Sequence, residues 1–323
     1  MVVCGHIIIF HSLNHENEFV RHIVLINMPL FFFLNGLVVK KNKNGEGNKW
    51  FAAVKRKTLS LLIPFFAWGA LITLFRNATY YEFLSNYFKF GYWYLPVLFQ
   101  CYVIYWLCEL LLRYVPKKHI QIETIALYTF AYFALRFVTK YIPPHINAIV
   151  DYFQLIEYLP YFFLGILTKR ANLAEKISEN CSCWATAVLI LSIVCYVWWD
   201  FYSGNVSTFI LRVCLIILIY LLFIAYDKYS GRCLQSLNQM LAVIGRHTLG
   251  IYMIQFFLFR YIDLHSIGTY LLESHNFIAF LALVSIVSLL VCYICIAIEK
   301  VIATSSLFSF ILLGKPMTRQ ILK

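Results

Sequence analysis

Ten apolar segments follow one another along the 323 residues of this chain, and most are long enough to cross a lipid bilayer as a helix. Inside a bilayer the backbone satisfies its own hydrogen bonds, so spanning segments form helices or closed barrels. Because 62% of the residues are hydrophobic and only 13% are charged, the chain lacks the polar surface of a water-soluble protein. We therefore predict a single all-α domain over 1–323, a polytopic membrane bundle of about ten transmembrane helices with the first one truncated. The segments are 1–13, 23–39, 58–76, 93–115, 119–139, 152–168, 184–200, 206–226, 240–262 and 276–299.

The distribution of lysine and arginine predicts how these helices are oriented. Cytoplasmic connections of membrane proteins carry an excess of both residues, and here 20 of the 27 fall in alternate connections. We therefore expect a multi-pass protein of the cell (cytoplasmic) membrane with both termini in the cytoplasm. Membrane orientation also explains the net charge of +12, so we expect a lipid bilayer and no nucleic acid as a partner. The connections are 40–57, 113–119, 169–183, 227–247 and the tail from residue 300.

A histidine inside the first apolar segment is the strongest candidate for a functional residue. His6 is the only histidine deep in such a segment. An ionisable side chain in hydrocarbon is costly, so it faces the bundle interior or a water-filled cavity and indicates a functional site. The alternative is that His6 only hydrogen-bonds a neighbouring helix.

Five short motifs resemble, in the same order, those of acyltransferase family 3, membrane proteins that move acyl groups onto cell-surface carbohydrates. The first two are the Gly5-His6 pair and the Met-Pro-Leu-Phe-Phe-Phe run of residues 28–36. The others are Trp-Tyr-Leu-Pro-Val-Leu-Phe at 93–99, Pro-Tyr-Phe-Phe-Leu-Gly within 158–165, and Gly-Arg-His-Thr-Leu-Gly-Ile-Tyr-Met-Ile-Gln at 245–255. The likeness covers nearly the whole chain.

Four positions depart from the family pattern. Asn27 stands where a second histidine is common, Asn35 and Thr248 stand where serine is usual, and Gln255 replaces a histidine.

The beginning of the chain also departs from the family pattern. The family carries a basic residue separated from the histidine by ten residues, which here would fall before Met1. Residues 2–13 would make only about 18 Å of helix, against a hydrocarbon core of roughly 30 Å. We therefore expect the first helix to be incomplete through a misplaced start or a truncated gene, and an inactive remnant is one interpretation.

The resemblance implies that His6 is the catalytic histidine. Transfer of an acyl group from a thioester to a sugar hydroxyl requires removal of the hydroxyl proton, and a side chain with a pKa near 7 suits that task. Donors for the developing oxyanion are needed as well. Asn27 and Asn35 are candidates because eight residues place them on nearly the same helix face, although interhelical hydrogen bonding is the simpler role for both.

Further residues are expected to bind the substrates. Trp93 belongs to the third motif, and an interfacial anchor explains it equally well. Arg136 and Glu157 lie within or near apolar segments, where ions are generally paired or line a cavity, and we place them near the acceptor path. Arg56 and Lys57, at the inner mouth of the third helix, would bind the phosphates of acyl-CoA. Ordinary positive-inside charge is the alternative for this pair.

These features predict an integral membrane O-acyltransferase. The donor would be cytoplasmic acyl-CoA, and we expect acetyl-CoA. The acceptor would be a hydroxyl of a surface polysaccharide, a lipid-linked glycan or another glycolipid. We expect no permanently bound cofactor and no metal, because the spacing of Cys292 and Cys295 has no second pair. The rival is a transporter or flippase for a glycan or lipid, which would show broken helices in matching halves.

Overall fold

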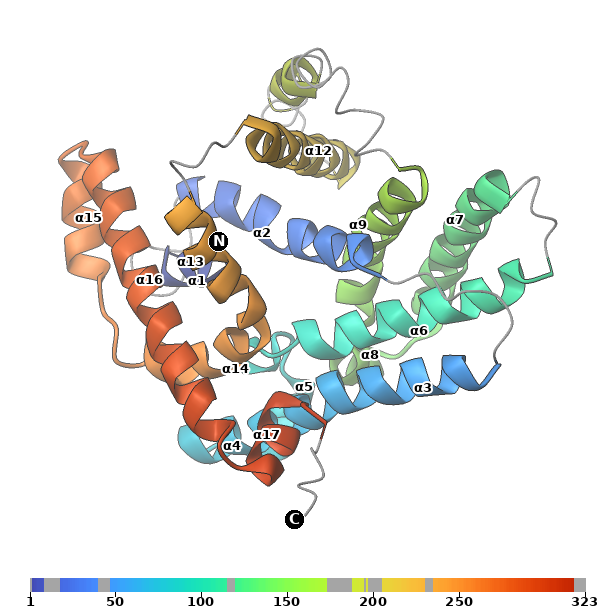
Figure 1. Ribbon diagram of the computed structural model, residues 1–323, viewed down its shortest axis with the longest axis horizontal. Coiled ribbons are helices and arrows are strands. Elements are labelled where there is room, and N and C mark those ends of the chain that lie inside the picture. Colours follow the sequence, from blue (N-terminus) through green and yellow to red (C-terminus); the bar gives the residue numbers. More distant parts are fainter. Residues whose placement is uncertain are drawn as a thin grey trace. The chain divides into compact units, whose positions relative to one another are not determined.

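A computed structural model describes residues 2–8, 18–39, 47–114, 120–172, 188–194, 196, 205–229 and 235–316. In these ranges the chain forms helices and turns and no strand (Figure 1). The chain divides into two compact units. The first unit comprises 1–5, 15–40 and 158–242, and the second comprises 6–14, 41–157 and 243–323. The predicted all-α class is confirmed for the described residues.

Some helices lie wholly or mostly in the first unit: α1 (Val2–Ile7), α2 (Glu18–Leu37), α9 (Tyr152–Arg170), α12 (Asn205–Tyr229) and α13 (Gln235–Arg246). The second unit begins with α3 (Gly47–Lys57), the π-helix η2 (Thr58–Leu62), α4 (Ile63–Arg76), α5 (Tyr80–Ser85), the 3-10 helix η3 (Lys89–Gly91) and α6 (Tyr94–Leu112). It continues with α7 (Ile120–Val138), the 3-10 helix η4 (Thr139–Tyr141), α8 (Pro144–Val150), α14 (Thr248–Phe259), α15 (His265–Glu273), α16 (Phe277–Ile302) and α17 (Ser306–Leu313).

Among the described residues, fewer helices have membrane-spanning length than the sequence predicts for the whole chain. Within the described residues, five are long and apolar enough: Phe51–Arg76, Tyr94–Leu112, Ile122–Tyr141, Thr208–Tyr226 and Phe277–Ile302. A sixth is possible if α13 and α14, which meet at a bend of 76°, form one broken span. The prediction of about ten transmembrane helices is therefore not confirmed.

The remaining predicted segments fall short for separate reasons. The segment 23–39 lies largely in the 20-residue helix α2, and the part of it with described side chains, Leu25–Leu37, is a shorter apolar helix. The segment 152–168 is helical but contains Gln154 and Glu157, which lower its mean hydropathy. The segments 1–13 and 184–200 lie partly outside the described residues.

The first unit is held together by the close crossing of α2 and α9. A Cβ on Gly36 would meet the carbonyl oxygen of Phe162, and one on Gly165 would meet that of Phe33. Small residues let membrane helices approach to backbone contact in this way. Aromatic rings fill the sides of the crossing, with Phe33 edge-on to Tyr220 of α12 at 5.7 Å between centroids. Figure 1 shows α12 lying beside α2.

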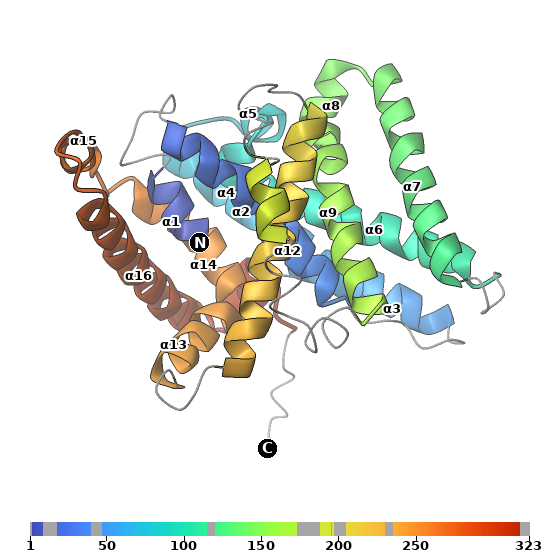
Figure 2. The same cartoon turned by 90° about the horizontal axis from the view of Figure 1, so that it is seen from above.

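The second unit is organised by helix packing around α14. This helix packs along α16 (Figure 2), and α17 packs on α4, where Trp68 Nε1 donates a hydrogen bond of 2.8 Å to the Leu312 carbonyl oxygen. Eight of the twelve residues of α14 are buried. A helix that is buried on most of its circumference belongs to the core, so α14 is the core helix of the second unit.

Connections that the charge pattern assigns to the same side of the membrane contact one another in the second unit. On one side, Lys89 of the connection before α6 pairs with Asp151 of the connection before α9. On the other, Lys315 of the tail pairs with Glu299 at the end of α16, and Glu299 also pairs with His247. This arrangement fits the predicted alternation of connections, and the side that faces the cytoplasm stays a prediction.

The glycine crossing predicts a site-specific loss of stability. Gly165→Ala is expected to destabilise the protein by about 1–3 kcal/mol, because the added methyl group would meet the Phe33 carbonyl oxygen. Thermal unfolding of the detergent-purified protein measures the effect. Gly245→Ala is the matched control, because a Cβ there meets no atom within 4 Å and alanine favours a helix. Equal unfolding midpoints for the two variants would contradict the close crossing.

Candidate active site

The His6 imidazole lies against α14 within the second unit. Its ring centroid is 5.3 Å from that of Phe256 and 5.9 Å from that of Phe259. Its side chain also hydrogen-bonds with that of Gln255, which is fully buried. The histidine of the first motif therefore meets the residue that replaces a histidine at the end of the last motif. The sequence identified both positions and did not predict that they interact.

The residues flanking Trp93 attach the third motif to the same helix. The Tyr92 hydroxyl donates a hydrogen bond of 2.7 Å to the Met253 carbonyl oxygen, and the Tyr92 ring lies edge-on to Phe256. The Tyr94 ring lies edge-on to Tyr252, and Trp93 between them is buried. Three motifs far apart in sequence thus converge on α14, and Phe256 contacts both His6 and Tyr92.

The backbone preceding Tyr92 has to pass close to α14. Gly91 adopts a φ of +110°, and a Cβ there would meet the Phe256 ring. The Tyr252 hydroxyl donates a hydrogen bond to the Gly91 carbonyl oxygen. Only glycine combines this φ with so close an approach, so the turn that ends at Gly91 fixes the aromatic wall beside His6.

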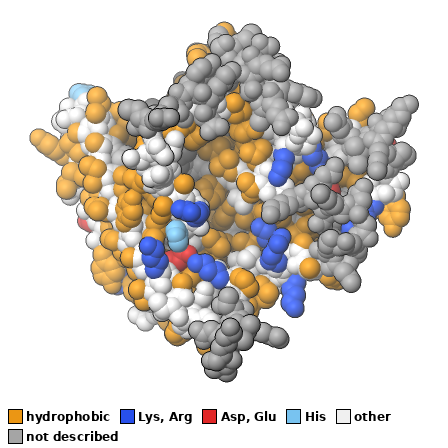
Figure 3. All heavy atoms as spheres, in the orientation of Figure 1, with side chains coloured by type: hydrophobic (Ala, Val, Ile, Leu, Met, Phe, Trp, Pro, Cys, Tyr) orange, Lys and Arg blue, Asp and Glu red, His pale blue; other side chains and the backbone are white. Residues whose placement is uncertain are grey.

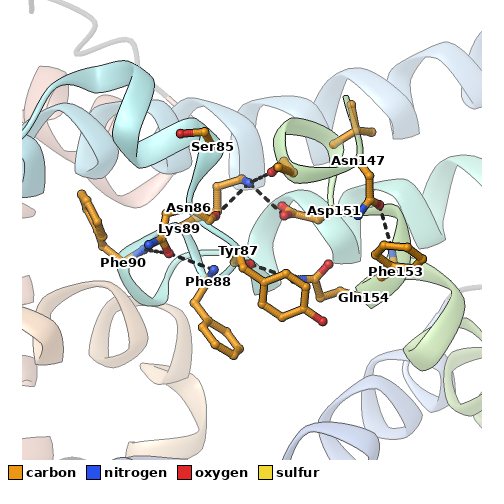
Figure 4. A network of polar contacts seen from close by, with 12 residues as sticks. Ser85, Asn86, Tyr87, Phe88, Lys89, Phe90, Asn147, Asp151, Phe153 and Gln154 are labelled. Carbon is orange, nitrogen blue, oxygen red and sulfur yellow. Dashed lines mark hydrogen bonds and ion pairs between the residues drawn. The ribbon is translucent and has the colours of Figure 1, made fainter. Parts of the chain in front are cut away.

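A buried ion pair stabilises that turn (Figure 4). Lys89 Nζ lies 2.8 Å from Asp151 Oδ1, and each side chain is only 1% exposed. Lys89 Nζ also donates to the carbonyl oxygens of Asn86 and Ala148. Gln154 Nε2 adds a hydrogen bond of 2.7 Å to the Tyr87 carbonyl oxygen. These bonds join the connection before α6 to α8, to Asp151 and to the start of α9.

The backbone at this network is strained. Lys89, Phe90 and Asp151 have φ values of 47°, 52° and 60°, in the left-handed region that non-glycine residues adopt at a cost of about 1–3 kcal/mol each. Such conformations persist where the surroundings enforce them. The Lys89–Asp151 ion pair holds these residues in the left-handed conformation. In the sequence, the pair is indicated only by isolated charges in two connections that otherwise carry little charge.

The other predicted site residues have definite places. Asn27 is buried in α2, and the Asn35 amide donates to the Phe31 carbonyl oxygen of the same helix at 2.9 Å. Both belong to the first unit, whereas His6 belongs to the second, so their role beside His6 stays a prediction. Arg136 is exposed on α7 and bonds the Tyr132 hydroxyl. Glu157 is exposed on α9.

The predicted donor-binding residues end α3. Arg56 is exposed and Lys57 is half-buried, with Lys57 Nζ lying 4.1 Å above the Tyr102 ring of α6. The π-helix η2 begins at the next residue, and short π-helical turns are frequent at functional sites. No sequence pattern indicates this irregularity, and η2 packs against α4 and α6.

Comparison with known proteins identifies the class. The sequence model of the acyltransferase domain, Acyl_transf_3, matches residues 1–297. Together with the apolar helices, this match defines a membrane protein of the acyltransferase class. The chain belongs to acyltransferase family 3. Neither a curated protein nor a solved structure matches it.

The buried ion pair predicts a large single-variant effect that a second substitution reverses. Lys89→Met is expected to cost about 3–5 kcal/mol at pH 7.5, because it leaves the Asp151 carboxylate buried without its counter-charge. Adding Asp151→Asn is expected to recover most of that loss, since no ion then remains buried and asparagine tolerates the left-handed backbone. Chemical unfolding in detergent measures both. A double variant as unstable as Lys89→Met would contradict the pairing.

The Asp151 carboxyl is expected to make the stability of the protein depend on pH. Burial raises the pKa of Asp151 from 3.8 to about 6, although the Lys89 ammonium opposes the shift. The stability contributed by the protonated carboxyl is complete below pH 3.8 and is lost as the pH rises through about 6. As the pH falls from 7.5 to 5, the wild type should therefore gain stability relative to the Asp151→Asn variant. A constant difference between their unfolding midpoints would contradict the raised pKa.

Proposed function

We propose that this family member is a membrane O-acyltransferase that moves an acyl group, acetyl in the first instance, from acyl-CoA to a carbohydrate hydroxyl. The acceptor would be a surface polysaccharide or a lipid-linked glycan. The observation that carries the proposal is the position of His6, beside Gln255 and in contact with the rings of Phe256 and Phe259. A basic nitrogen held by one polar neighbour in an apolar wall suits proton abstraction.

In this mechanism His6 is the general base. Its imidazole takes the proton of the acceptor hydroxyl as the oxygen attacks the thioester carbonyl. The new C–O bond forms, the C–S bond breaks, and the CoA thiolate leaves and is protonated. Gln255 fixes the orientation of the ring through their hydrogen bond, and the phenylalanines limit access of water that would hydrolyse the thioester.

The remaining predicted residues have supporting parts in this proposal. Asn27 and Asn35 would donate to the oxyanion, and Trp93, Arg136 and Glu157 would bind the acceptor. Arg56 and Lys57 would bind the donor's phosphates, for which cations near the mouth of a helix bundle are suited. We place the donor on the cytoplasmic side because the charge pattern predicts α3 to end there.

The proposal predicts loss of acyl transfer without loss of folding. His6→Ala is expected to lower kcat for transfer from labelled acetyl-CoA by about 10²–10⁴-fold, because the hydroxyl loses its proton acceptor. Labelled carbohydrate recovered from membranes measures the rate. His265→Ala is the matched control, since His265 is exposed on α15 and should leave the rate unchanged. Undiminished transfer by His6→Ala would remove His6 from the chemistry.

One observation favours the transporter alternative. The bend of 76° between α13 and α14 resembles the broken helices that line substrate paths in transporters. Transporters of that kind carry such breaks in matching halves, and the described residues contain one. Glycan or lipid movement in proteoliposomes that proceeds without acetyl-CoA would favour transport, whereas acceptor acylation that requires acetyl-CoA favours the transferase.

A further inference from the structure

A buried carboxylate joins two donors on the side of the second unit opposite the Lys89–Asp151 pair. Glu299 is 5% exposed, and its Oε1 accepts a hydrogen bond of 2.8 Å from Lys315 Nζ. Its Oε2 lies 3.0 Å from His247 Nδ1. Because one carboxylate contacts both, the side chains of Lys315 and His247 are fixed next to each other. None of these three residues belongs to the site predicted from the sequence.

The tail brings this cluster to the end of α3. The helix α17 packs on α4, and Gly314 follows it with a φ of +62°. A Cβ on Gly314 would meet the backbone of Ser60 in η2, and Ser60 Oγ donates to the Lys57 carbonyl oxygen at 3.3 Å. The residue before Lys315 therefore packs against the helical turn that follows Lys57.

The three donors keep unused hydrogen-bonding capacity. Lys57 contacts the neutral Tyr102 ring, and among the described residues no carboxylate lies within ion-pair distance of it. Lys315 is 47% exposed and has used one of its three N–H donors on Glu299. His247 is 25% exposed, and no described residue hydrogen-bonds to its Nε2, which donates to a ligand in the protonated form of the ring.

The surroundings are strongly basic. Figure 3 shows lysine and arginine side chains gathered on the face it draws, beside a histidine and a carboxylate. Lys55 and Arg56 precede Lys57, Arg246 precedes His247, and Lys300 follows Glu299. Glu299 is already bonded on both oxygens, so an incoming ligand meets mainly cationic donors.

We propose that Lys57, Lys315 and His247 form a binding site for phosphate groups, with Glu299 as the residue that positions the last two. Phosphate oxygens accept several hydrogen bonds at once from such donors. The assignment of this site to the phosphates of the acyl-CoA donor rests on the proposed function. The phosphate of an anionic lipid headgroup has the same chemistry and is the other source.

Binding of coenzyme A without turnover tests this site. Calorimetry on the full chain in nanodiscs of phosphatidylcholine should show binding that weakens about tenfold in Lys315→Gln, the loss of one charged hydrogen bond, and similarly in Lys57→Gln. Lys315→Arg should restore the affinity. The exposed Lys140 supplies the control, Lys140→Gln, which should bind as the wild type does.

Glu299→Gln separates an electrostatic role from a structural one. It removes a negative charge, but its amide oxygen still accepts a hydrogen bond from Lys315 and its amide N–H still donates, so the neighbouring side chains stay positioned. We expect its affinity for coenzyme A to equal or exceed that of the wild type. Equal weakening by Glu299→Gln and Lys315→Gln, or no weakening by Lys315→Gln, would overturn the site.

Two further results separate this inference from the proposed function. If coenzyme A binding depends on Lys315 but the protein transfers no acyl group, the phosphate site is supported and the proposed transferase function is rejected. If Lys315→Gln transfers acyl groups with an unchanged KM for acetyl-CoA, the phosphate site alone is rejected. Retention of phosphatidylglycerol that depends on Lys315, with no coenzyme A binding, supports the phosphate site and assigns it to lipid.

Discussion

The cost of burying polar groups in an apolar helix bundle governs the second unit. A buried ion is tolerated when its partner is buried with it, and Lys89 with Asp151 satisfies that condition at one side of the unit. Glu299 satisfies it at the other side, through Lys315 and His247. Between these two clusters runs α14, whose interior polar residue, Gln255, faces His6. The polar contacts thus fix both sides of the helix that carries the candidate site.

This arrangement relates stability to the proposed chemistry. The Lys89–Asp151 pair holds a strained turn, the turn ends at Gly91 against Phe256, and Phe256 packs on His6. The tail fixes the opposite side, where Gly314 packs on η2 and Lys315 pairs with Glu299. In the proposed reaction the first chain of contacts orients the base and the second binds the donor. Each of these two series of contacts connects a buried ion with a group that the proposed reaction uses.

Sequence patterns predicted the helical class and the family, because hydrophobic length and short motifs are local signals. The catalytic role that they assign to His6 stays a prediction. The predicted number of spanning helices is not confirmed among the described residues, where polar residues such as Gln154 and Glu157 make α9 less apolar than its length suggests. The sequence patterns missed the Lys89–Asp151 and Glu299–Lys315 pairs, whose members are 62 and 16 residues apart. Pairing of that kind depends on tertiary packing. The same holds for the π-helix after Lys57.

The central claim is that His6 and Gln255 act together in acyl transfer. A double-mutant cycle on the transfer rate tests it, with His6→Ala and Gln255→Leu made singly and in combination. If Gln255 works by orienting the imidazole, Gln255→Leu lowers the rate of the wild type and has no further effect once His6 is alanine. Equal rate losses in the two backgrounds would show that Gln255 acts independently of His6, and would contradict this account of the site.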